Sequence, residues 1–251
     1  MAIQKTDAIV LKTLPFRSSS LLVTFFSKTH GKVKGIAKGV RQEREMRGSL
    51  FELFTQLEIV YYEKTRSDLH LISEGFILES YEPIRSQLET IAYASYFAEL
   101  VDELTEFHDP HPVIFHLLDF SYRYLPSLSP ERLARLFEIQ LLREIGWVPY
   151  LEDCIRCHAK PSDQPFFSPN QGALLCKNCA RDTPDAKPIS EETLSVLRYY
   201  LQHDLETSIK LSVSFQSEQG LALLMNRFFQ FRIHRPLKSL SFLEKIKPVL
   251  C

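Results

Sequence analysis

Alternating apolar and polar positions predict β-structure in the first third of the chain. The clearest case lies at 54–62, where Leu57, Ile59 and Tyr61 share one face of a strand and polar side chains dominate the other. Further apolar runs, separated by turn residues, occur at 3–13, 21–26, 32–37 and 69–78. Because a closed barrel leaves no exposed edge strand, five short strands in about 80 residues predict a small β-barrel.

After Pro83 the apolar positions recur every three or four residues, which is the period of an α-helix. Several helices begin at residue types that favour helix N-termini: Asp109 and Ser129 are each followed by proline, and Ser190 by two glutamates. We expect the first three helices to form one bundle. The helices are predicted at about 88–104, 109–124, 129–146, 190–203 and 219–233.

Four of the five cysteines form two Cys-x-x-Cys pairs in a loop-rich segment. Cys154 and Cys157 form one pair, Cys176 and Cys179 form the other, and 18 residues separate the pairs. Each pair lets two thiolates of one tight turn reach the same ion, and two pairs complete the tetrahedral sulfur shell that suits zinc. The sequence therefore predicts one structural Zn²⁺ ion, which replaces a core that this short polar segment lacks.

Other interpretations of these cysteines are weaker. Residues 154–158 also match the Cys-x-x-Cys-His pattern of haem attachment, but the second pair and the lack of an export signal argue against it. A catalytic zinc of the deaminase type requires a His-x-Glu signature, which precedes neither pair. Four buried or redox-active thiols are the remaining alternative.

The formal net charge of −1 hides a separation of charge along the chain. Residues 1–81 carry a net charge of +3, residues 82–153 carry −8 and residues 221–251 carry +5. Basic ends favour a polyanionic partner, although an acidic middle is also common in solvated helices. The basic tail after Arg232 suits DNA, an acidic peptide or the C-terminus of the preceding helix.

No apolar run approaches the roughly 20 residues that span a bilayer. We therefore expect no membrane partner and a cytoplasmic location.

The most basic segment of the predicted barrel lies at 28–47. Its glycines leave the backbone open to the close approach of a phosphate chain. A barrel with a cationic groove and aromatic side chains is typical of single-strand binding, whereas lysines that protect a solvated hairpin edge are the alternative. We predict DNA contacts from Lys32, Lys34, Lys38, Arg41, Arg44 and Arg47. One or two aromatic side chains are expected to stack on bases, among Phe16, Phe25, Phe26, Tyr61 and Tyr62.

Several stretches are similar, in order and spacing, to the RecO family of bacterial recombination mediators over nearly the whole chain. They are 7–12 (DAIVLK), 31–41 (GKVKGIAKGVR), 93–100 (YASYFAEL), 137–146 (FEIQLLREIG) with Cys154-x-x-Cys157, and 236–239 (PLKS). The resemblance implies an α+β multidomain protein: an N-terminal OB-fold β-barrel, an α-helical bundle domain and an inserted four-cysteine zinc module. We place these at 1–80, at 81–148 with 188–251, and at 149–187.

The resemblance also implies a function without enzymatic activity. Family members bind single- and double-stranded DNA and anneal complementary strands without ATP. They act on strands coated by single-stranded DNA-binding protein (SSB) and, with the partner RecR, help to load the RecA recombinase. The four cysteines match the family's zinc positions, which some members lack. Lys32, Lys34, Lys38 and Arg41 match its DNA-binding segment, whereas Arg44 and Arg47 rest on charge alone.

The resemblance finally suggests a site for SSB and a location at the bacterial nucleoid during repair. The SSB tail is acidic and ends in an apolar residue, so an arginine beside apolar side chains suits it. Arg132 and Arg135 on the third predicted helix are the candidates.

Three other functions remain open: an RNA-binding barrel–zinc protein, a metal-dependent nuclease and a zinc-stapled interaction scaffold. The chain lacks the GxxxxGK[ST] loop, so nucleotide hydrolysis is not expected. No GxSxG or HExxH motif of hydrolases appears either.

Overall fold

The computed structural model describes residues 2–40, 49–64, 67–160, 164–233 and 235–250. The chain forms two compact units. Unit 1 consists of Met1–Pro130 and Leu237–Cys251, and unit 2 is Glu131–Pro236. The helices are therefore divided differently from the sequence-based boundaries, because the first two group with the barrel and the third groups with the cysteine segment.

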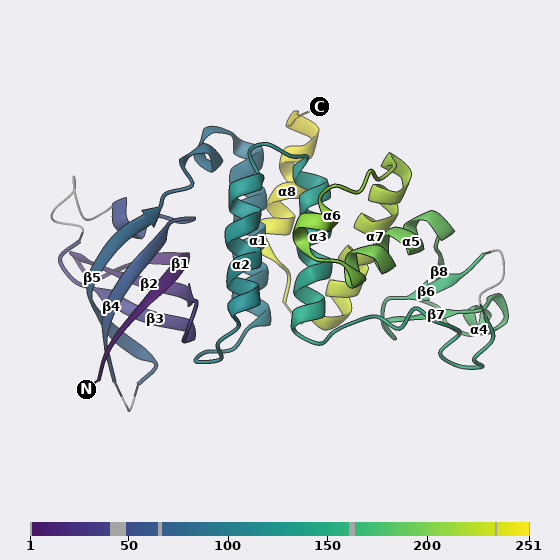
Figure 1. Cartoon of the computed structure of the whole chain (residues 1–251), viewed down its shortest axis with the longest axis horizontal. Helices are drawn as coiled ribbons and strands as arrows, with labels where there is room; N and C mark the ends of the chain where they lie inside the picture. The colour runs from purple at the N-terminus through teal and green to yellow at the C-terminus, as the bar shows by residue number, and fades with distance from the viewer. Residues whose placement is uncertain (1, 41–48, 65–66, 161–163, 234, 251) are drawn as a thin grey trace. The chain divides into compact units, whose positions relative to one another are not determined.

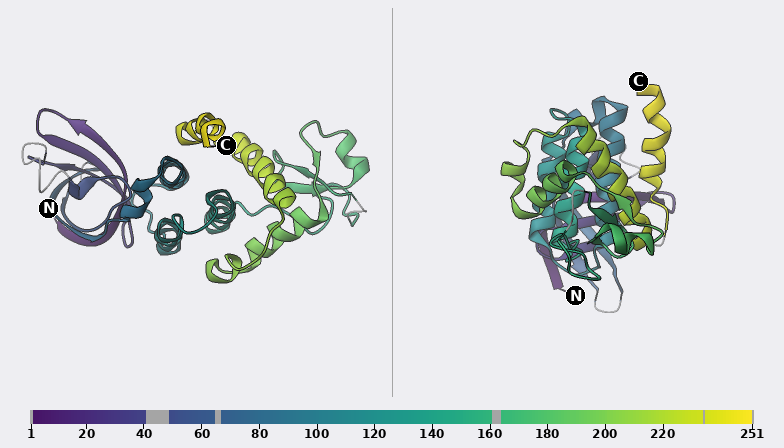
Figure 2. Two further views of the ribbon diagram at one scale, coloured as in Figure 1. Left: turned by 90° about the horizontal axis from the view of Figure 1, so that it is seen from above. Right: turned by 90° about the vertical axis from the view of Figure 1, so that its right-hand side faces the viewer.

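Five strands of unit 1 close into an OB-like barrel in the order β1-β2-β3-β5-β4, which confirms the predicted barrel (Figure 1; Figure 2, left). Only the β3–β5 pair is parallel. The alternation in β4 is confirmed as well, because Leu57, Ile59 and Tyr61 all point into the buried interior. The strands are β1 (Ala2–Phe16), β2 (Ser20–Ser27), β3 (Gly31–Ala37), β4 (Gln56–Glu63) and β5 (Leu69–Glu79).

The helices of unit 1 pack around α1, which contacts both β1 and α8. The sequence did not predict α8, and its first N–H groups are bound by a carboxylate from a distant element. The backbone nitrogens of Lys238 and Ser239 donate to the Glu99 carboxylate of α1 at 3.0 and 2.8 Å. The helical elements are η2 (Glu82–Ser86), α1 (Leu88–Leu104), α2 (Pro112–Tyr124) and α8 (Lys238–Leu250).

Helix α2 begins later than predicted, at Pro112 and not after Asp109. The intervening residues are held against the barrel. The backbone nitrogen of His108 donates to the carbonyl oxygen of Lys32 at 3.2 Å, and the backbone of Asp109 packs against Gly31. The connection between α1 and α2 therefore extends the barrel wall before the helix starts.

Unit 2 combines helices with a small sheet in the order β7-β6-β8. The predicted cap of α5 is confirmed, because the Ser190 hydroxyl accepts from the Thr193 backbone nitrogen at 3.1 Å. Helix α7 begins earlier than predicted, at Phe215. The elements are α3 (Pro130–Glu144), β6 (Phe166–Ser168), β7 (Ala173–Leu175), α4 (Lys177–Arg181), β8 (Lys187–Pro188), α5 (Glu191–Gln202), α6 (Leu205–Ser208) and α7 (Phe215–Arg232).

Throughout the described ranges, no helix has both the length and the apolar character that crossing a bilayer requires.

Candidate metal centre and nucleic-acid interface

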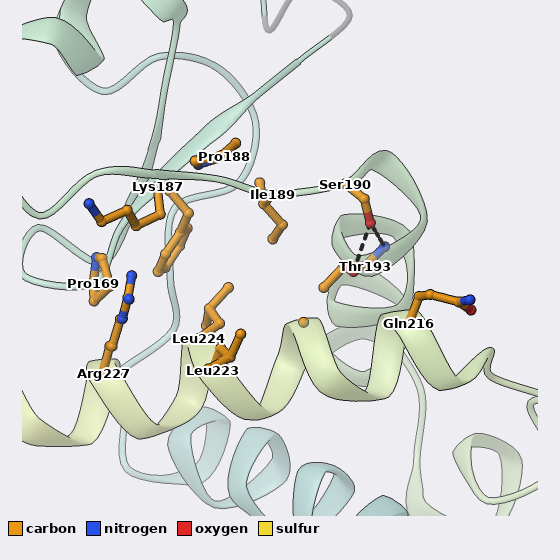
Figure 3. A pocket seen from close by; sticks show the side chains of 12 residues that line it. Pro169, Lys187, Pro188, Ile189, Ser190, Thr193, Gln216, Leu223, Leu224 and Arg227 are labelled. Carbon is orange, nitrogen blue, oxygen red and sulfur yellow. Dashed lines mark hydrogen bonds between the residues drawn. The ribbon is translucent and has the colours of Figure 1, made fainter.

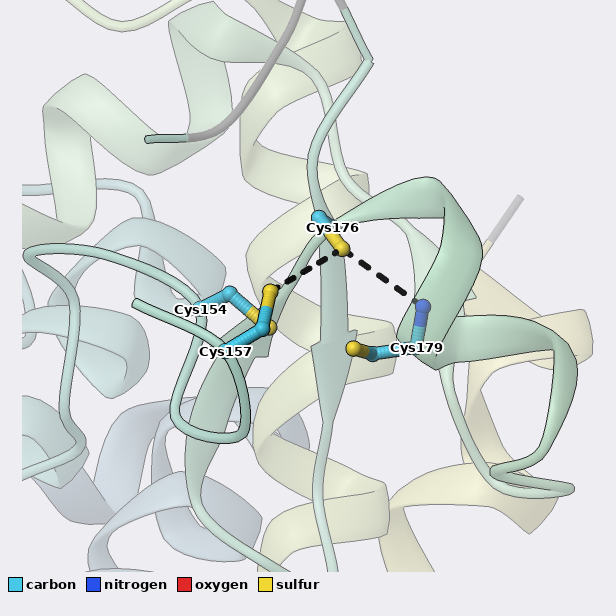
Figure 4. A group of neighbouring side chains, drawn as sticks. All are labelled: Cys154, Cys157, Cys176 and Cys179. Atoms are coloured by element: carbon cyan, nitrogen blue, oxygen red, sulfur yellow. Dashed lines mark hydrogen bonds between the residues drawn. The ribbon is translucent and has the colours of Figure 1, made fainter. Parts of the chain in front are cut away.

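The four paired cysteines converge in unit 2, which confirms their predicted clustering (Figure 4). All four Sγ atoms lie within 4.8 Å of one another, and those of Cys157 and Cys176 are 3.7 Å apart. Four sulfurs at about 2.3 Å from a central zinc ion form a tetrahedron with edges of about 3.8 Å. The donor set and its spacing therefore fit a closed Zn²⁺ site, with no open position for substrate.

Strand β7 and helix α4 position this cluster. Cys176 follows β7 directly and caps α4, where the backbone nitrogen of Cys179 points at its sulfur from 3.5 Å. The first pair is tied to the same strand, because the backbone nitrogen of Ile155 donates to the carbonyl oxygen of Leu174 at 3.0 Å. The two tight turns are therefore held together by backbone bonds as well as by any ion between them.

The surroundings of the cluster lower the pKa of some of its thiols and raise the pKa of others. Burial opposes ionisation of Cys154, but backbone N–H groups of Cys176, Cys157 and Arg156 point at its sulfur and lower its pKa to about 6. The neighbouring sulfurs of Cys176 and Cys157 raise the pKa of Cys179 to about 12. Four thiolates at this spacing require a cation among them.

Lys32 lies in the contact between β3 and α1, not on an open surface. Its ammonium is 3.3 Å from the Asp102 carboxylate, also donates to the carbonyl oxygen of Asp102, and lies 4.8 Å from the ring centre of Phe107. Only 6% of the Lys32 side chain is exposed. The expected DNA contact from Lys32 is corrected by this finding, because α1 already neutralises the charge.

The glycines of β3 also differ from expectation. A Cβ atom at Gly31 would lie 2.0 Å from the carbonyl oxygen of Asp109, and one at Gly35 would lie 2.4 Å from Cδ1 of Ile72. The space beside these two glycines is therefore filled by other atoms of the protein and is not open to a phosphate chain. Gly39 has open space around its Cβ position and a φ of +76°.

Lys12, Lys34 and Lys38 lie on the outer surface of the barrel. Lys34 is partly exposed and Lys38 is exposed, and strand pairing aligns Lys12 with Lys34, because both oppose Thr24. These lysines form no ion pair with any described residue. We call Lys12, Lys34 and Lys38 the barrel lysines.

Beside Lys12 and Lys34, two residues further along each strand, outward-facing side chains form an apolar row around the barrel. Strand pairing joins its members in sequence, and all are partly or largely exposed, up to 63% for Ile3. The sequence analysis missed this row because strand register decides which outward residues are neighbours. The apolar row consists of Leu14, Leu22, Ile36, Leu71, Tyr62 and Ile3.

The aromatic candidates divide by burial. Phe25, Phe26 and Tyr61 are buried, so they belong to the packed interior or lie beneath the helices. Tyr62 and Phe16 are partly exposed and remain available for stacking. Arg41, Arg44 and Arg47 lie outside the described residues.

Both arginines expected to bind the SSB tail are engaged within unit 2. Arg132 donates to the carbonyl oxygens of Ile209, at 2.7 Å, and of Leu211. Arg135 pairs with Glu138 at 2.6 Å, and both side chains are buried. The structure thus places both arginines in contacts within unit 2, and neither lines the apolar groove between β8 and α7.

A groove of about 300 Å³ opens between β8 and α7 (Figure 3). Its lining is mainly apolar and includes Ile189, Leu223 and Leu224. Lys187 and Arg227 lie together at the end nearest Pro169, and Gln216 lies at the opposite end (Figure 3). The groove thus combines an apolar floor with two cations, which the sequence order did not reveal.

Comparisons with known proteins agree across the whole chain. The family models "Recombination protein O N terminal" and "Recombination protein O C terminal" match residues 1–81 and 85–241. A protein of Syntrophus aciditrophicus described as "DNA repair protein RecO" is 31% identical, with 98% of this chain and 97% of the relative covered. Relatives with the same description, from Pelotomaculum thermopropionicum and Halalkalibacterium halodurans, are 29% and 26% identical, with 98% and 97% of this chain and 95% of each relative covered.

Proposed function

Because the chain belongs to the RecO family of DNA repair proteins, we propose that it anneals complementary DNA strands and helps to load a recombinase on SSB-coated single strands. The observation that carries this proposal is the outer face of the barrel, where the barrel lysines border the partly exposed apolar row.

This face offers both components of single-strand recognition. The barrel lysines neutralise phosphates, and the apolar row, with Tyr62 in it, receives bases. Stacking of one base on an aromatic ring contributes about 1–3 kcal/mol and tolerates any sequence. Three phosphate contacts would contribute about −2 to the slope of log affinity against log salt concentration.

Annealing requires no covalent chemistry in this account. Bound strands repel each other less once their phosphates are neutralised, and their local concentration rises on the protein. Pairing therefore accelerates without ATP, and we assign no enzymatic activity to the chain.

We assign one structural Zn²⁺ ion to Cys154, Cys157, Cys176 and Cys179. When bound, it supplies a cross-link between the two turns that β7 and α4 position. The described part of the segment 149–187 contains only short strands and the short helix α4, so such a cross-link replaces part of a hydrophobic core.

We propose the groove between β8 and α7 as the site for the acidic SSB tail, in place of Arg132 and Arg135. Lys187 and Arg227 would pair with its carboxylates, and Leu223 and Leu224 would receive its apolar end. The resemblance suggests RecR and RecA as further partners at the nucleoid. A fluorescent tail peptide should bind the wild-type protein, and Arg227→Glu should weaken binding while Lys210→Glu, elsewhere on unit 2, should not.

The function is tested by annealing of complementary oligonucleotides coated with SSB, without ATP. The Lys12, Lys34 and Lys38→Glu variant should lose annealing, whereas Lys210→Glu with Lys245→Glu, two exposed lysines outside the barrel strands, should retain it. Failure of the wild-type protein to anneal would remove the proposal. A preference for RNA over DNA of equal sequence would favour an RNA-binding function instead.

A further inference from the structure

The two cysteine turns carry basic side chains that no role described above uses. From Cys154 through Arg181 the sequence has four Lys or Arg residues and one acidic residue, Asp163. Arg156, Lys160 and Lys177 are exposed. We propose that these three residues, the knuckle cations, form a second surface for the phosphate backbone of single-stranded DNA, distinct from the barrel face.

The geometry brings the two turns to one corner of unit 2. Arg156 precedes Cys157, Lys177 follows Cys176, and the sulfurs of these cysteines are 3.7 Å apart (Figure 4). Cys157 is itself exposed, so this corner lies at the protein surface. The two segments that carry Arg156 and Lys177, which are distant in sequence, therefore meet at this corner.

Two nearby acidic residues, Asp153 and Asp185, are partly buried and engaged in hydrogen bonds, whereas Glu152 is exposed. The Asp153 carboxylate accepts from the Tyr150 hydroxyl at 3.0 Å and lies 3.3 Å from the His158 ring. Asp185 accepts from the Ser168 hydroxyl and the Asn170 backbone nitrogen, at 2.6 and 3.0 Å. Asp182 is exposed beside Arg181, and for that reason Arg181 is not counted among the knuckle cations.

A different role for these cations would be to balance the metal centre, because Zn²⁺ with four thiolates has a formal charge of about −2. In the described structure, however, backbone N–H groups and not these side chains point at the sulfurs of Cys154 and Cys176. The knuckle cations form no ion pair with a described residue. Their charge is therefore available to a ligand in solution.

A second surface has a direct consequence for annealing, and this step rests on the proposed function. A chain with one phosphate-binding face on each compact unit has room for two strands. Each strand would then be held by cations of a different unit, and pairing would not require both strands to share the barrel.

The test measures binding of a fluorescent oligothymidylate to the full chain over a range of salt concentrations. Arg156→Gln with Lys177→Gln should reduce the magnitude of the salt slope by about 1.4, because about 0.7 is lost per single-strand phosphate contact. The matched control, Lys210→Gln with Lys245→Gln, should leave the slope unchanged. Zinc content and the thermal unfolding midpoint of each variant establish that the cluster and the fold are intact.

A third variant, Lys34→Gln with Lys38→Gln, separates this inference from the proposed function. A smaller salt slope in both the knuckle variant (Arg156→Gln with Lys177→Gln) and the barrel variant (Lys34→Gln with Lys38→Gln) supports two surfaces. Loss in the barrel variant alone overturns the second surface and leaves the barrel face in place. A knuckle variant that loses zinc but keeps its salt slope also overturns it and assigns the cations to the metal centre. Absence of wild-type binding would contradict the proposed function itself.

Discussion

Lys32 and Lys34 illustrate how position on a single strand separates a structural from a functional residue. Both point outward from β3, as alternation predicts, but the helices of unit 1 cover only the first. Strand period determines the face on which a side chain lies, whereas tertiary packing determines whether that face meets solvent. The sequence indicated the correct strand face for both lysines, but it could not show that Asp102 of α1 covers Lys32.

Replacement of Lys32 should affect stability and not DNA binding. Lys32→Met leaves the Asp102 carboxylate without its cation, and we expect a loss of about 2 kcal/mol in the free energy of unfolding. Urea unfolding measures this loss. Lys34→Met, on the same face but more exposed, should change stability by less than about 0.5 kcal/mol and should weaken DNA binding. A loss of DNA binding without a loss of stability in Lys32→Met, or a loss of stability without weaker DNA binding in Lys34→Met, would contradict the structural role of Lys32.

Gly31 should tolerate no side chain. Its φ is +64°, and an added Cβ would lie 2.0 Å from a backbone oxygen, so Gly31→Ala combines a strained conformation with a steric clash. We expect a loss of at least about 3 kcal/mol, measured by urea unfolding. Gly39→Ala is the matched control, because its φ is +76° with nothing near the Cβ position, and about 1 kcal/mol is expected.

Among the elements, those with local signals were predicted well and those without them were missed. The Ser190 cap marked α5 in the sequence, and the alternation at 54–62 marked β4. Helix α8 had no comparable signal, because its N-terminus is bound by Glu99 from α1. Similarly, the Cys-x-x-Cys spacing predicted the cluster of sulfurs, whereas the apolar row depends on strand register and the groove on tertiary packing.

Metal removal should unfold one part of unit 2. Chelation, or Cys176→Ser, should release one zinc ion per chain and destabilise the small sheet and α4, because the thiolates then lack their cation. Metal analysis and the rate of tryptic cleavage at Arg156 and Lys177 report the two effects. Cys251→Ser, a cysteine outside the two pairs, is the control. Unchanged protection after loss of the ion would argue against a structural role.

The contact between β5 and the α1–α2 connection should weaken in mild acid. Burial lowers the pKa of His70, and nearby His108, whose ring centre is 5.4 Å away, lowers it further. The unfolded state therefore binds the proton more tightly, so this contribution to stability is full above the ordinary histidine pKa of about 6.5 and decreases as the pH falls below it. Urea unfolding at several pH values measures the decrease, which His70→Gln should reduce. An unchanged pH dependence in that variant would assign the effect elsewhere.

At the scale of the whole molecule, the order of segments along the chain does not match their division into two compact units. Residues 237–250 follow unit 2 in the sequence but fold with the barrel, where Leu243 is buried and α8 contacts α1. The prediction of a single bundle from neighbouring helical segments followed the order of the chain. Contacts between its distant parts divide those helices between two units instead.

The return of α8 should be essential for the stability of the barrel unit. Leu243→Ala removes a buried side chain and should cost about 3 kcal/mol in urea unfolding. Phe242→Ala alters the adjacent residue, which is 41% exposed, and should cost less than about 1 kcal/mol. Equal effects of the two substitutions would show that α8 is not held in this orientation.

This return also sets an order of events during synthesis. The strands of the barrel are synthesised before unit 2, yet the helix that covers α1 is made only after all of unit 2. Domains generally fold as they emerge from the ribosome. The side of α1 that α8 covers is therefore exposed while the rest of the chain is translated. A ribosome that stops before α8 is made therefore releases a protein with its barrel and unit 2 present but with α1 lacking its covering helix, which makes it a substrate for proteolysis.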